Sequence, residues 1–197
     1  MKKVANTDVE IDALLSQRWS PRAFDSGYIM NEIEIKSLLE AARWAPSCYG
    51  DQPWKFIIFN KSNATAWTGA LNCLAVGNQD WAMNASLLIV VCAHQLFNHN
   101  GELNRWGQYD SGAAAENICL QATSLNLHAH QMGGFNESKT KVLAKIPSEY
   151  DVMSFIAIGK CLKENEYNDE QAKREKMPRK RNALEEIYFI NEWESIG

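Results

Sequence analysis

The sequence predicts an α+β protein with a single domain, in which helices alternate with short buried strands. Residues 31–43 have the apolar spacing of a helix, and residues 55–59, 86–93 and 153–159 are short apolar runs typical of buried strands. The chain has 197 residues, enough to enclose a sizeable core, and no linker rich in glycine, proline or serine divides it. We therefore expect residues 1–197 to form one domain.

The helix predicted at residues 31–43 has clear start and stop signals. Asn31 is a candidate N-cap with Glu34 three residues later, and Pro46 follows the last turn. The apolar residues recur at the spacing of one helix face, and they are Ile35, Leu38, Leu39 and Ala42. A shorter helix is expected just before Arg18.

Two further segments need a partner to cover them. Residues 111–127 are apolar around most of a helix circumference, so this helix is expected to be covered on nearly all sides, by its own domain or by a second subunit. The chain is polar and charged from about Glu164 until residues 183–191, where apolar side chains reappear. This last segment must also be buried against something.

Composition and charge argue against several classes of protein. The formal net charge is −4, which does not favour general binding to nucleic acid. No run reaches the roughly 20 apolar residues that cross a bilayer, and the N-terminus lacks a signal-peptide stretch, so a cytoplasmic location is expected. The cysteines are odd in number and form no CxxC pair, which favours free thiols at Cys48, Cys73, Cys92, Cys119 and Cys161.

Common catalytic and cofactor motifs are absent. The chain contains no G-x-G-x-x-G fingerprint, no P-loop and no G-x-S-x-G elbow. Residues 128–130, His-Ala-His, offer two imidazoles to a metal, but no carboxylate or cysteine close in sequence completes a ligand set. No cysteine is placed beside a histidine. We therefore assign neither a metal site nor an obligatory catalytic acid, base or nucleophile.

The segment Arg-Trp-Ser-Pro-Arg that begins at Arg18 predicts an anion site. Pro21 moves Ser20 out of the helical region, and an extended or turned backbone puts Arg18, Ser20 and Arg22 roughly on one side. Two guanidinium groups beside a hydroxyl form a good phosphate cradle, because each guanidinium can donate two parallel hydrogen bonds. The alternative is two surface arginines that pair with acids such as Asp25.

This segment is part of a longer pattern. "RWSPRAF" is followed by a helix, by "APSCYGDQPW" and by a strand, in that order. In these segments the chain resembles the nitroreductase family of flavoproteins, whose usual pattern is R-R-S-x-R-x-F, a helix, A-P-S-x-x-N-x-Q-P-W and a strand. Further similarity lies at residues 77–93, 110–127, 132–135, 155–160 and 178–187, so the resemblance covers nearly the whole chain.

The resemblance implies a three-layer α/β/α sandwich with a mainly antiparallel central sheet, assembled as an intertwined homodimer. It implies that FMN binds at the subunit interface, that NADH or NADPH donates electrons, and that a small organic molecule accepts them. Neither a membrane nor a nucleic acid is implied as a partner. On this view, residues 183–197 form a C-terminal extension that packs on the partner subunit.

The resemblance also assigns residues that bind FMN. One segment is expected to hold the phosphate, the ribityl chain and the pyrimidine edge, and it comprises Arg18, Trp19, Ser20 and Arg22. A turn contributed by the other subunit lies beside the ring and comprises Pro46, Ser47, Cys48 and Gly50. The ring is expected to be contacted by Asn78. A loop that directs a backbone N–H at flavin N5 comprises Met132, Gly133 and Gly134. A basic pair that reaches the phosphate comprises Arg179 and Arg181.

Two positions depart from the family pattern. Gly50 stands where many members have asparagine, so a side-chain contact to the ring would be missing, although glycine still allows a close backbone approach. Trp81 stands where some members have a lysine near the flavin pyrimidine, and loss of that cation would stabilise the reduced, anionic ring less. These differences concern the flavin potential and the acceptor more than FMN binding.

The expected activity is electron transfer from NAD(P)H, through flavin N5, to a nitroaromatic, a quinone or a similar acceptor in a ping-pong cycle. Trp106 and Tyr109 are candidates to line the acceptor slot, or they pack at the dimer interface. Two alternatives stay open. One is a protein that binds FMN or another phosphate ligand without turnover. The other uses the basic residues 173–181 to bind nucleic acid or a protein partner, although such a run usually means only a solvated connection.

Overall fold

The computed structural model describes residues 3–193. Its strands are β1 (Trp54–Asn60), β2 (Leu87–His94), β3 (His128–Met132) and β4 (Tyr150–Gly159). Its α-helices are α1 (Ala13–Gln17), α2 (Glu32–Arg43), α3 (Ala64–Leu71), α4 (Val76–Ala82), α5 (Gly107–Ser124), α6 (Glu137–Ala144) and α7 (Asp169–Glu175). Three short 3₁₀ turns complete the elements of this part of the chain: η1 (Cys48–Gly50), η2 (Glu164–Glu166) and η3 (Leu184–Glu186).

The strands form one antiparallel sheet in the order β1-β2-β4-β3. β2 and β4 lie in the middle, and β2 is buried along almost its whole length because helices cover both faces of the sheet. The three predicted strands are confirmed with shifted ends, since β1 and β4 begin earlier than the apolar runs do and β2 is displaced by one residue. These results confirm the predicted α+β class and the antiparallel sheet.

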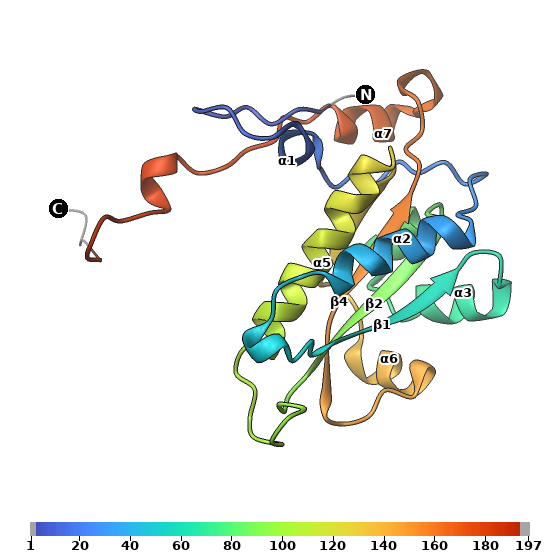
Figure 1. Cartoon of the computed structure of the whole chain (residues 1–197). Coiled ribbons are helices and arrows are strands. Elements are labelled where there is room, and N and C mark those ends of the chain that lie inside the picture. Colours follow the sequence, from blue (N-terminus) through green and yellow to red (C-terminus); the bar gives the residue numbers. More distant parts are fainter. Residues whose placement is uncertain (1–2, 194–197) are drawn as a thin grey trace.

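Helices pack on both faces of the sheet and give three layers (Figure 1). α2 and α5 cover one face, where they bury Leu38, Ile118, Leu87, Ile89 and Ile156 among other apolar side chains. α3, α4 and α6 lie on the other face, whose core includes Trp67, Trp81, Leu88, Val90 and Phe155. Successive residues of β2 therefore alternate between two cores, as the period of a strand requires.

The two main predicted helices are present. α2 begins after Asn31, whose side chain accepts from the Glu34 N–H while Glu34 accepts from the Asn31 N–H, so the predicted capping signal is confirmed. α5 was expected at residues 111–127 but spans 107–124. It starts earlier because Gly107 can approach the His94 carbonyl, where a Cβ atom would lie 2.4 Å from the oxygen. It stops earlier because Asn126 is left-handed, with φ of 57°.

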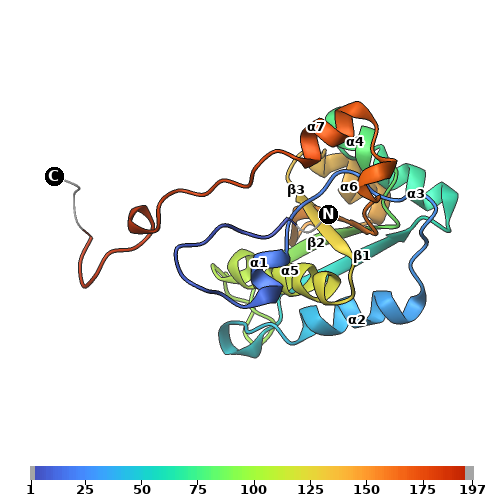
Figure 2. The same ribbon diagram turned by 90° about the horizontal axis from the view of Figure 1, so that it is seen from above.

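Two apolar surfaces stay uncovered within one chain. On α5, Tyr109 is 77% exposed and Gly112 is exposed, so the expectation of cover on nearly all sides is not met by this chain alone. The C-terminal segment leaves the body of the molecule as an extended arm (Figures 1 and 2). Its large apolar side chains are solvent-exposed, and they are Leu184, Ile187, Tyr188, Ile190 and Trp193. Residues 194–197 of the predicted extension lie outside the described residues.

The N-terminal segment meets α7 and the residues that follow it above α5, before the C-terminal arm leaves the body (Figures 1 and 2). The Lys3 ammonium donates to the Glu175 carbonyl at 2.7 Å, and the Ala5 N–H donates to the Ser16 carbonyl at 2.8 Å. This convergence positions the candidate site. Among the described residues, no helix has both the length and the apolar composition needed to cross a membrane.

Candidate functional site

A basic pocket of about 460 Å³ lies where the N-terminal segment meets residues 174–181. It brings together Arg18, Ser20 and Arg22 from the N-terminal segment with Arg179 and Arg181 from the C-terminal segment, although more than 150 residues separate the two groups in sequence. The other lining residues are Lys3, Trp19, His130, Arg174, Glu175 and Met177. The predicted convergence of the two arginine groups is therefore present in the structure.

The backbone of the N-terminal segment is fixed from α7 by one buried carboxylate. Glu175 is 3% exposed, and its Oε1 accepts from the N–H groups of Arg22 at 2.8 Å and Ala23 at 3.1 Å. A carboxylate that accepts from two backbone amides holds the loop without using the arginine side chains. The guanidinium groups of Arg18 and Arg22 can therefore face the pocket.

Arg179 ties the C-terminal segment to the N-terminal one. Its Nη1 donates to the carbonyls of Lys3 at 2.9 Å and Ser16 at 2.7 Å. Burial lowers the pKa of Arg179, and Arg18 and Arg181 lower it further. Arg181 is exposed, and its Nη1 donates to the neighbouring Lys180 carbonyl. The two arginines thus differ, because Arg179 supports the wall of the pocket while Arg181 projects at its rim.

The charges that line the pocket favour an anion. Its six cationic side chains are Lys3, Arg18, Arg22, Arg174, Arg179 and Arg181, and its one acidic residue is Glu175, whose Oε1 already accepts from two amides. Guanidinium groups gathered in this way repel one another until an anion binds among them. A phosphate group, with about two negative charges and three acceptor oxygens, matches this arrangement.

The acid that pairs with Arg18 is not the one expected from the sequence. Arg18 Nε lies 3.4 Å from Glu116 Oε1 on α5, and burial raises the pKa of Glu116 against the smaller opposite effect of Arg18. Asp25, which was the expected alternative partner, accepts from the Gly27 N–H within its own turn. The Arg18 side chain is also placed against Ser20, with Nη1 3.4 Å from Oγ.

The predicted glycine loop follows β3. Asn78 on α4 donates from Nδ2 to the Gly134 carbonyl at 3.0 Å, and the Ala75 N–H donates to the same oxygen at 2.9 Å. A Cβ atom at position 134 would lie 2.8 Å from Asn78 Nδ2, so glycine permits this contact. Gly133 is exposed and Met132 is buried beneath the loop. The structure thus joins Asn78 to the glycine loop, as a support for its backbone.

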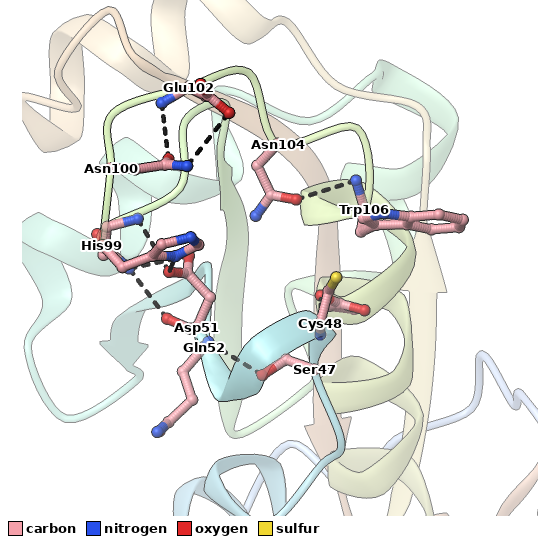
Figure 3. A network of polar contacts seen from close by, with 11 residues as sticks. Ser47, Cys48, Asp51, Gln52, His99, Asn100, Glu102, Asn104 and Trp106 are labelled. Atoms are coloured by element: carbon pink, nitrogen blue, oxygen red, sulfur yellow. Dashed lines mark hydrogen bonds and ion pairs between the residues drawn. The ribbon is translucent and has the colours of Figure 1, made fainter.

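The predicted turn around Pro46–Gly50 lies elsewhere, beside the first turn of α5 (Figures 1 and 3). The Cys48 N–H donates to Asp110 Oδ2 at 3.0 Å, and the Ser47 Oγ accepts from the Gln52 N–H at 3.0 Å. Tyr49 and Gly50 have positive φ values of 55° and 67°. None of these turn residues lines the basic pocket, so one chain does not unite the two groups of predicted flavin contacts.

A second loop braces this turn through Asp51 (Figure 3). The Asp51 carboxylate is only 2% exposed and accepts from the Asn98 N–H at 2.9 Å, while His99 Nδ1 lies 3.4 Å from the same oxygen. The strained backbone of the turn is therefore held by contacts from outside it. The candidates for the acceptor slot are Trp106, which is 42% exposed, and Tyr109, which is 77% exposed. Their rings lie edge to face, with 6.5 Å between the ring centroids.

Trp81 packs against His130, which lines the basic pocket, while Trp81 itself lines a smaller neighbouring cavity. Trp81 is 5% exposed, and its ring centroid lies 4.5 Å from that of His130 and 6.2 Å from that of Phe24. The Arg22 guanidinium carbon lies 5.7 Å from the Trp81 ring centroid. The tryptophan noted as a departure from the family pattern thus packs beneath Arg22.

Sequence reasoning did not assign five of the lining residues to the site, and they are Lys3, His130, Arg174, Glu175 and Met177. Glu175 had a signal, since it is the one acid within the basic run of residues 173–181. His130 had one too, because it lies two residues from the glycine loop and at strand spacing from His128. Nothing in the sequence shows that the N-terminal segment meets α7, so no sequence feature identified Lys3 as a residue of the pocket.

Comparisons with known proteins find relatives of this chain. The sequence matches the family model for the nitroreductase family over residues 15–66 and 66–160. It is 26% identical over 186 residues to the oxygen-insensitive NADPH nitroreductase of Helicobacter acinonychis, covering 77% of this chain and 87% of that protein.

Solved structures are similar as well. A crystal structure described as an oxidoreductase containing FMN is 33% identical, with a TM-score of 0.87 and 96% coverage of each chain. An FMN-dependent nitroreductase from Clostridium difficile R20291 is 25% identical, with a TM-score of 0.65, covering 86% of this chain and 98% of that one. The matching family model spans well over half of the sequence. The chain belongs to the nitroreductase family.

Proposed function

We propose that this protein is an FMN-dependent oxidoreductase that transfers electrons from NADH or NADPH to a small organic acceptor. The observation that carries the proposal is the basic pocket of about 460 Å³, in which arginines of residues 18–22 and 174–181 of a nitroreductase-family chain line one space. A relative named as an NADPH nitroreductase and a similar structure described as containing FMN support the same donor and cofactor.

The residues of the pocket fit a flavin phosphate. Arg18, Ser20 and Arg22 supply donors on one side, and Arg179 and Arg181 supply them on the other. Trp19 is buried behind the first group, where it fixes the course of the segment. Charge-assisted hydrogen bonds from several guanidinium groups suit a phosphate monoester better than a carboxylate, because the phosphate has three terminal oxygens.

The remaining flavin contacts are proposed to come from the glycine loop and from a second copy of the chain. Gly133 and Gly134, after Met132, would place a backbone N–H close to flavin N5, and Asn78 would support this loop. The turn of Pro46, Ser47, Cys48 and Gly50 does not reach the pocket of its own chain. We propose that it packs against the flavin ring held by the partner subunit of a homodimer.

When bound, FMN supplies the redox chemistry, since its N5 accepts hydride from the nicotinamide and returns electrons to the acceptor. The protein holds the ring, donates a backbone hydrogen bond near N5 and puts positive charge from Arg18 or Arg22 close to the pyrimidine edge. Donor and acceptor would occupy the same flat slot in turn, which gives a ping-pong cycle. We assign no side chain as an obligatory acid or base.

Two departures from the family pattern bear on the acceptor. Trp81 is uncharged and buried, so it cannot stabilise a reduced, anionic ring as a lysine would. Gly50 offers only backbone to the ring of the partner subunit. We propose that the flavin potential is set mainly by the arginines and the glycine loop, and that nitroaromatics and quinones are the acceptor classes to test first.

The test is to purify the protein, record its visible spectrum, add NADH or NADPH without oxygen and then add a panel of acceptors. We expect a flavin spectrum that bleaches with at least one nicotinamide and returns with a nitroaromatic or a quinone. Flavin that binds but never bleaches would contradict the enzyme and leave a binding protein. Salt-dependent retention on DNA without flavin would instead favour the basic run of residues 173–181 as a nucleic-acid surface.

A further inference from the structure

His130 is a half-buried imidazole in the wall of the basic pocket that the proposed function does not use. It lies on β3, two residues before the glycine loop, and its Nδ1 lies 2.9 Å from the Pro21 carbonyl oxygen. Because a carbonyl can only accept, Nδ1 carries the hydrogen of this bond. The ring therefore ties the strand that leads to the glycine loop to the segment that carries Arg18 and Arg22.

Charged groups approach His130 from every element around it. Burial lowers the pKa of His130, and Arg22 and Arg18 lower it further, whereas backbone hydrogen bonds with Pro21 and Ser20 oppose this. Other charged residues nearby line the same pocket or the smaller cavity of about 140 Å³ beside Trp81. One more titratable residue lies on β3 itself. They are Lys3, Arg174, Glu175, Arg179 and Arg181, then Asp80 on α4 and Glu170 on α7, and then His128 on β3.

We propose that His130 takes up a proton when the phosphate group of FMN enters the basic pocket, and so couples cofactor binding to pH. The inference rests on the proposed function, since FMN is the ligand that brings the phosphate. In the empty pocket, the surrounding cations disfavour a further positive charge on the ring. A bound phosphate reverses that balance because its negative charge offsets the guanidinium groups.

The direction of the pH effect follows from this coupling. If the bound state holds one more proton than the free state, FMN binds more tightly as the pH falls through the range in which bound His130 titrates. A single proton changes the affinity by at most about tenfold for each pH unit. The FMN phosphate itself also titrates, near pH 6, and its protonation weakens binding; comparison with a variant that lacks only His130 cancels this contribution.

The first experiment measures the FMN dissociation constant at about pH 6 and about pH 8 for wild type, His130→Asn and His128→Asn. Asparagine keeps a donor for the Pro21 carbonyl but cannot take up a proton. His128 is the matched control, because it lies two residues earlier on β3 and lines a separate cavity of about 110 Å³. Burial lowers its pKa to about 4, so its ring stays neutral over this range.

We expect the ratio of the His130→Asn constant to the wild-type constant to rise roughly three- to tenfold between the higher and the lower pH. The ratio for His128→Asn should stay flat. Calorimetry in buffers of different ionisation enthalpy should show that wild type takes up more protons for each FMN than His130→Asn does. Equal proton uptake by both proteins would overturn the inference, while their ability to bind FMN would leave the proposed function intact.

A second measurement covers the case in which His130→Asn does not fold. The chain has four histidines, so the imidazole NMR signals of the wild-type protein can be assigned from single variants at the other three. We expect the His130 signal to titrate at higher pH with FMN than without it. An unchanged titration would contradict the inference, whereas failure to bind any flavin would contradict the proposed function instead.

Discussion

Some side chains of the pocket hold the backbone in place, and others are free to face a ligand. Glu175 accepts from the Arg22 and Ala23 amides, and Arg179 donates to the carbonyls of Lys3 and Ser16. These contacts use backbone groups of the loop and not the Arg22 guanidinium, whereas Arg18 is partly balanced by Glu116 on α5. A pocket built in this way keeps its positive charge for a ligand.

The first prediction compares two arginines with different surroundings. Arg18→Ala should raise the FMN dissociation constant roughly ten- to a hundredfold, because it removes a charge-assisted contact of about 1.5–3 kcal/mol from the pocket. Arg43→Ala should leave FMN affinity unchanged, since Arg43 is an exposed residue of α2 that pairs with Glu40. Fluorescence titration of both variants makes the comparison, and equal affinities would remove Arg18 from the site.

A second prediction concerns acid stability. Burial lowers the pKa of His128 to about 4 from its ordinary 6.5. A depressed pKa means that the ring contributes stability above about pH 6.5 and that this contribution is lost as the pH falls toward 4, because only the unfolded chain binds the proton readily. The loss should reach roughly 2–3 kcal/mol.

Urea unfolding at about pH 7 and about pH 4.5 tests this prediction on wild type, His128→Gln and His99→Gln. The His128 variant should lose less stability on acidification than wild type does. His99 is the control because its side chain is 48% exposed. An acid loss of the same size in all three proteins would show that His128 does not cause it.

At the scale of elements, the segment after α1, β3 and α7 bring sequence-distant groups to one place. Strands β1, β2 and β4 and helices α2 and α5 could be predicted because their apolar patterns, the Asn31 cap and Pro46 are local signals. The ends of α5 could not be predicted, since Gly107 packs closely against the His94 carbonyl and the helix begins in a polar stretch. The site residues that belong to the motifs could be predicted from the sequence. Glu175 and His130 could not, because they reach the site through contacts with residues more than 100 positions away.

The two C-terminal arginines give an element-scale prediction. Replacing both Arg179 and Arg181 by glutamine should raise the FMN dissociation constant roughly ten- to a hundredfold and leave riboflavin binding nearly unchanged. The single variants separate two effects. Arg181→Gln should lower the melting temperature only when FMN is present, because Arg181 is exposed. Arg179→Gln should also destabilise the protein without FMN, since it loses two bonds to backbone carbonyls.

Melting curves with and without FMN, and titrations with FMN and riboflavin, provide the readout for these variants. High salt should abolish the effect of Arg181→Gln if that residue is only a solvated charge. A double variant that loses FMN and riboflavin affinity in equal proportion would show that the arginines support the fold and do not contact the phosphate.

At the scale of the whole molecule, one chain leaves its apolar arm and one side of α5 uncovered. Ile187 is 68% exposed and Ile190 is 73% exposed, and both lie on the arm that extends from the body (Figure 2). Contiguous exposed apolar surface of this kind marks an interaction site. A second copy would cover it and would also bring the turn of residues 46–50 to the flavin.

We therefore predict an obligate homodimer, and sedimentation of the flavin-loaded protein at micromolar concentration tests it. Ile187→Asp with Ile190→Asp should raise the dimer dissociation constant by a hundredfold or more, because each buried isoleucine contributes about 1.5–3 kcal/mol. Val142→Asp on α6 is the matched control, since Val142 is 80% exposed and lies outside the arm. A folded, flavin-loaded monomer of the wild-type chain would contradict the prediction.

The central claim is that the basic pocket between the N-terminal segment and residues 174–181 binds the phosphate of FMN. The most direct test is the ratio of the riboflavin and FMN dissociation constants of the wild-type protein, because the two ligands differ only in that phosphate. We predict that FMN binds at least about a hundredfold more tightly, which corresponds to about 2.7 kcal/mol. Equal affinity for the two flavins would show that no phosphate is bound there and would contradict the account.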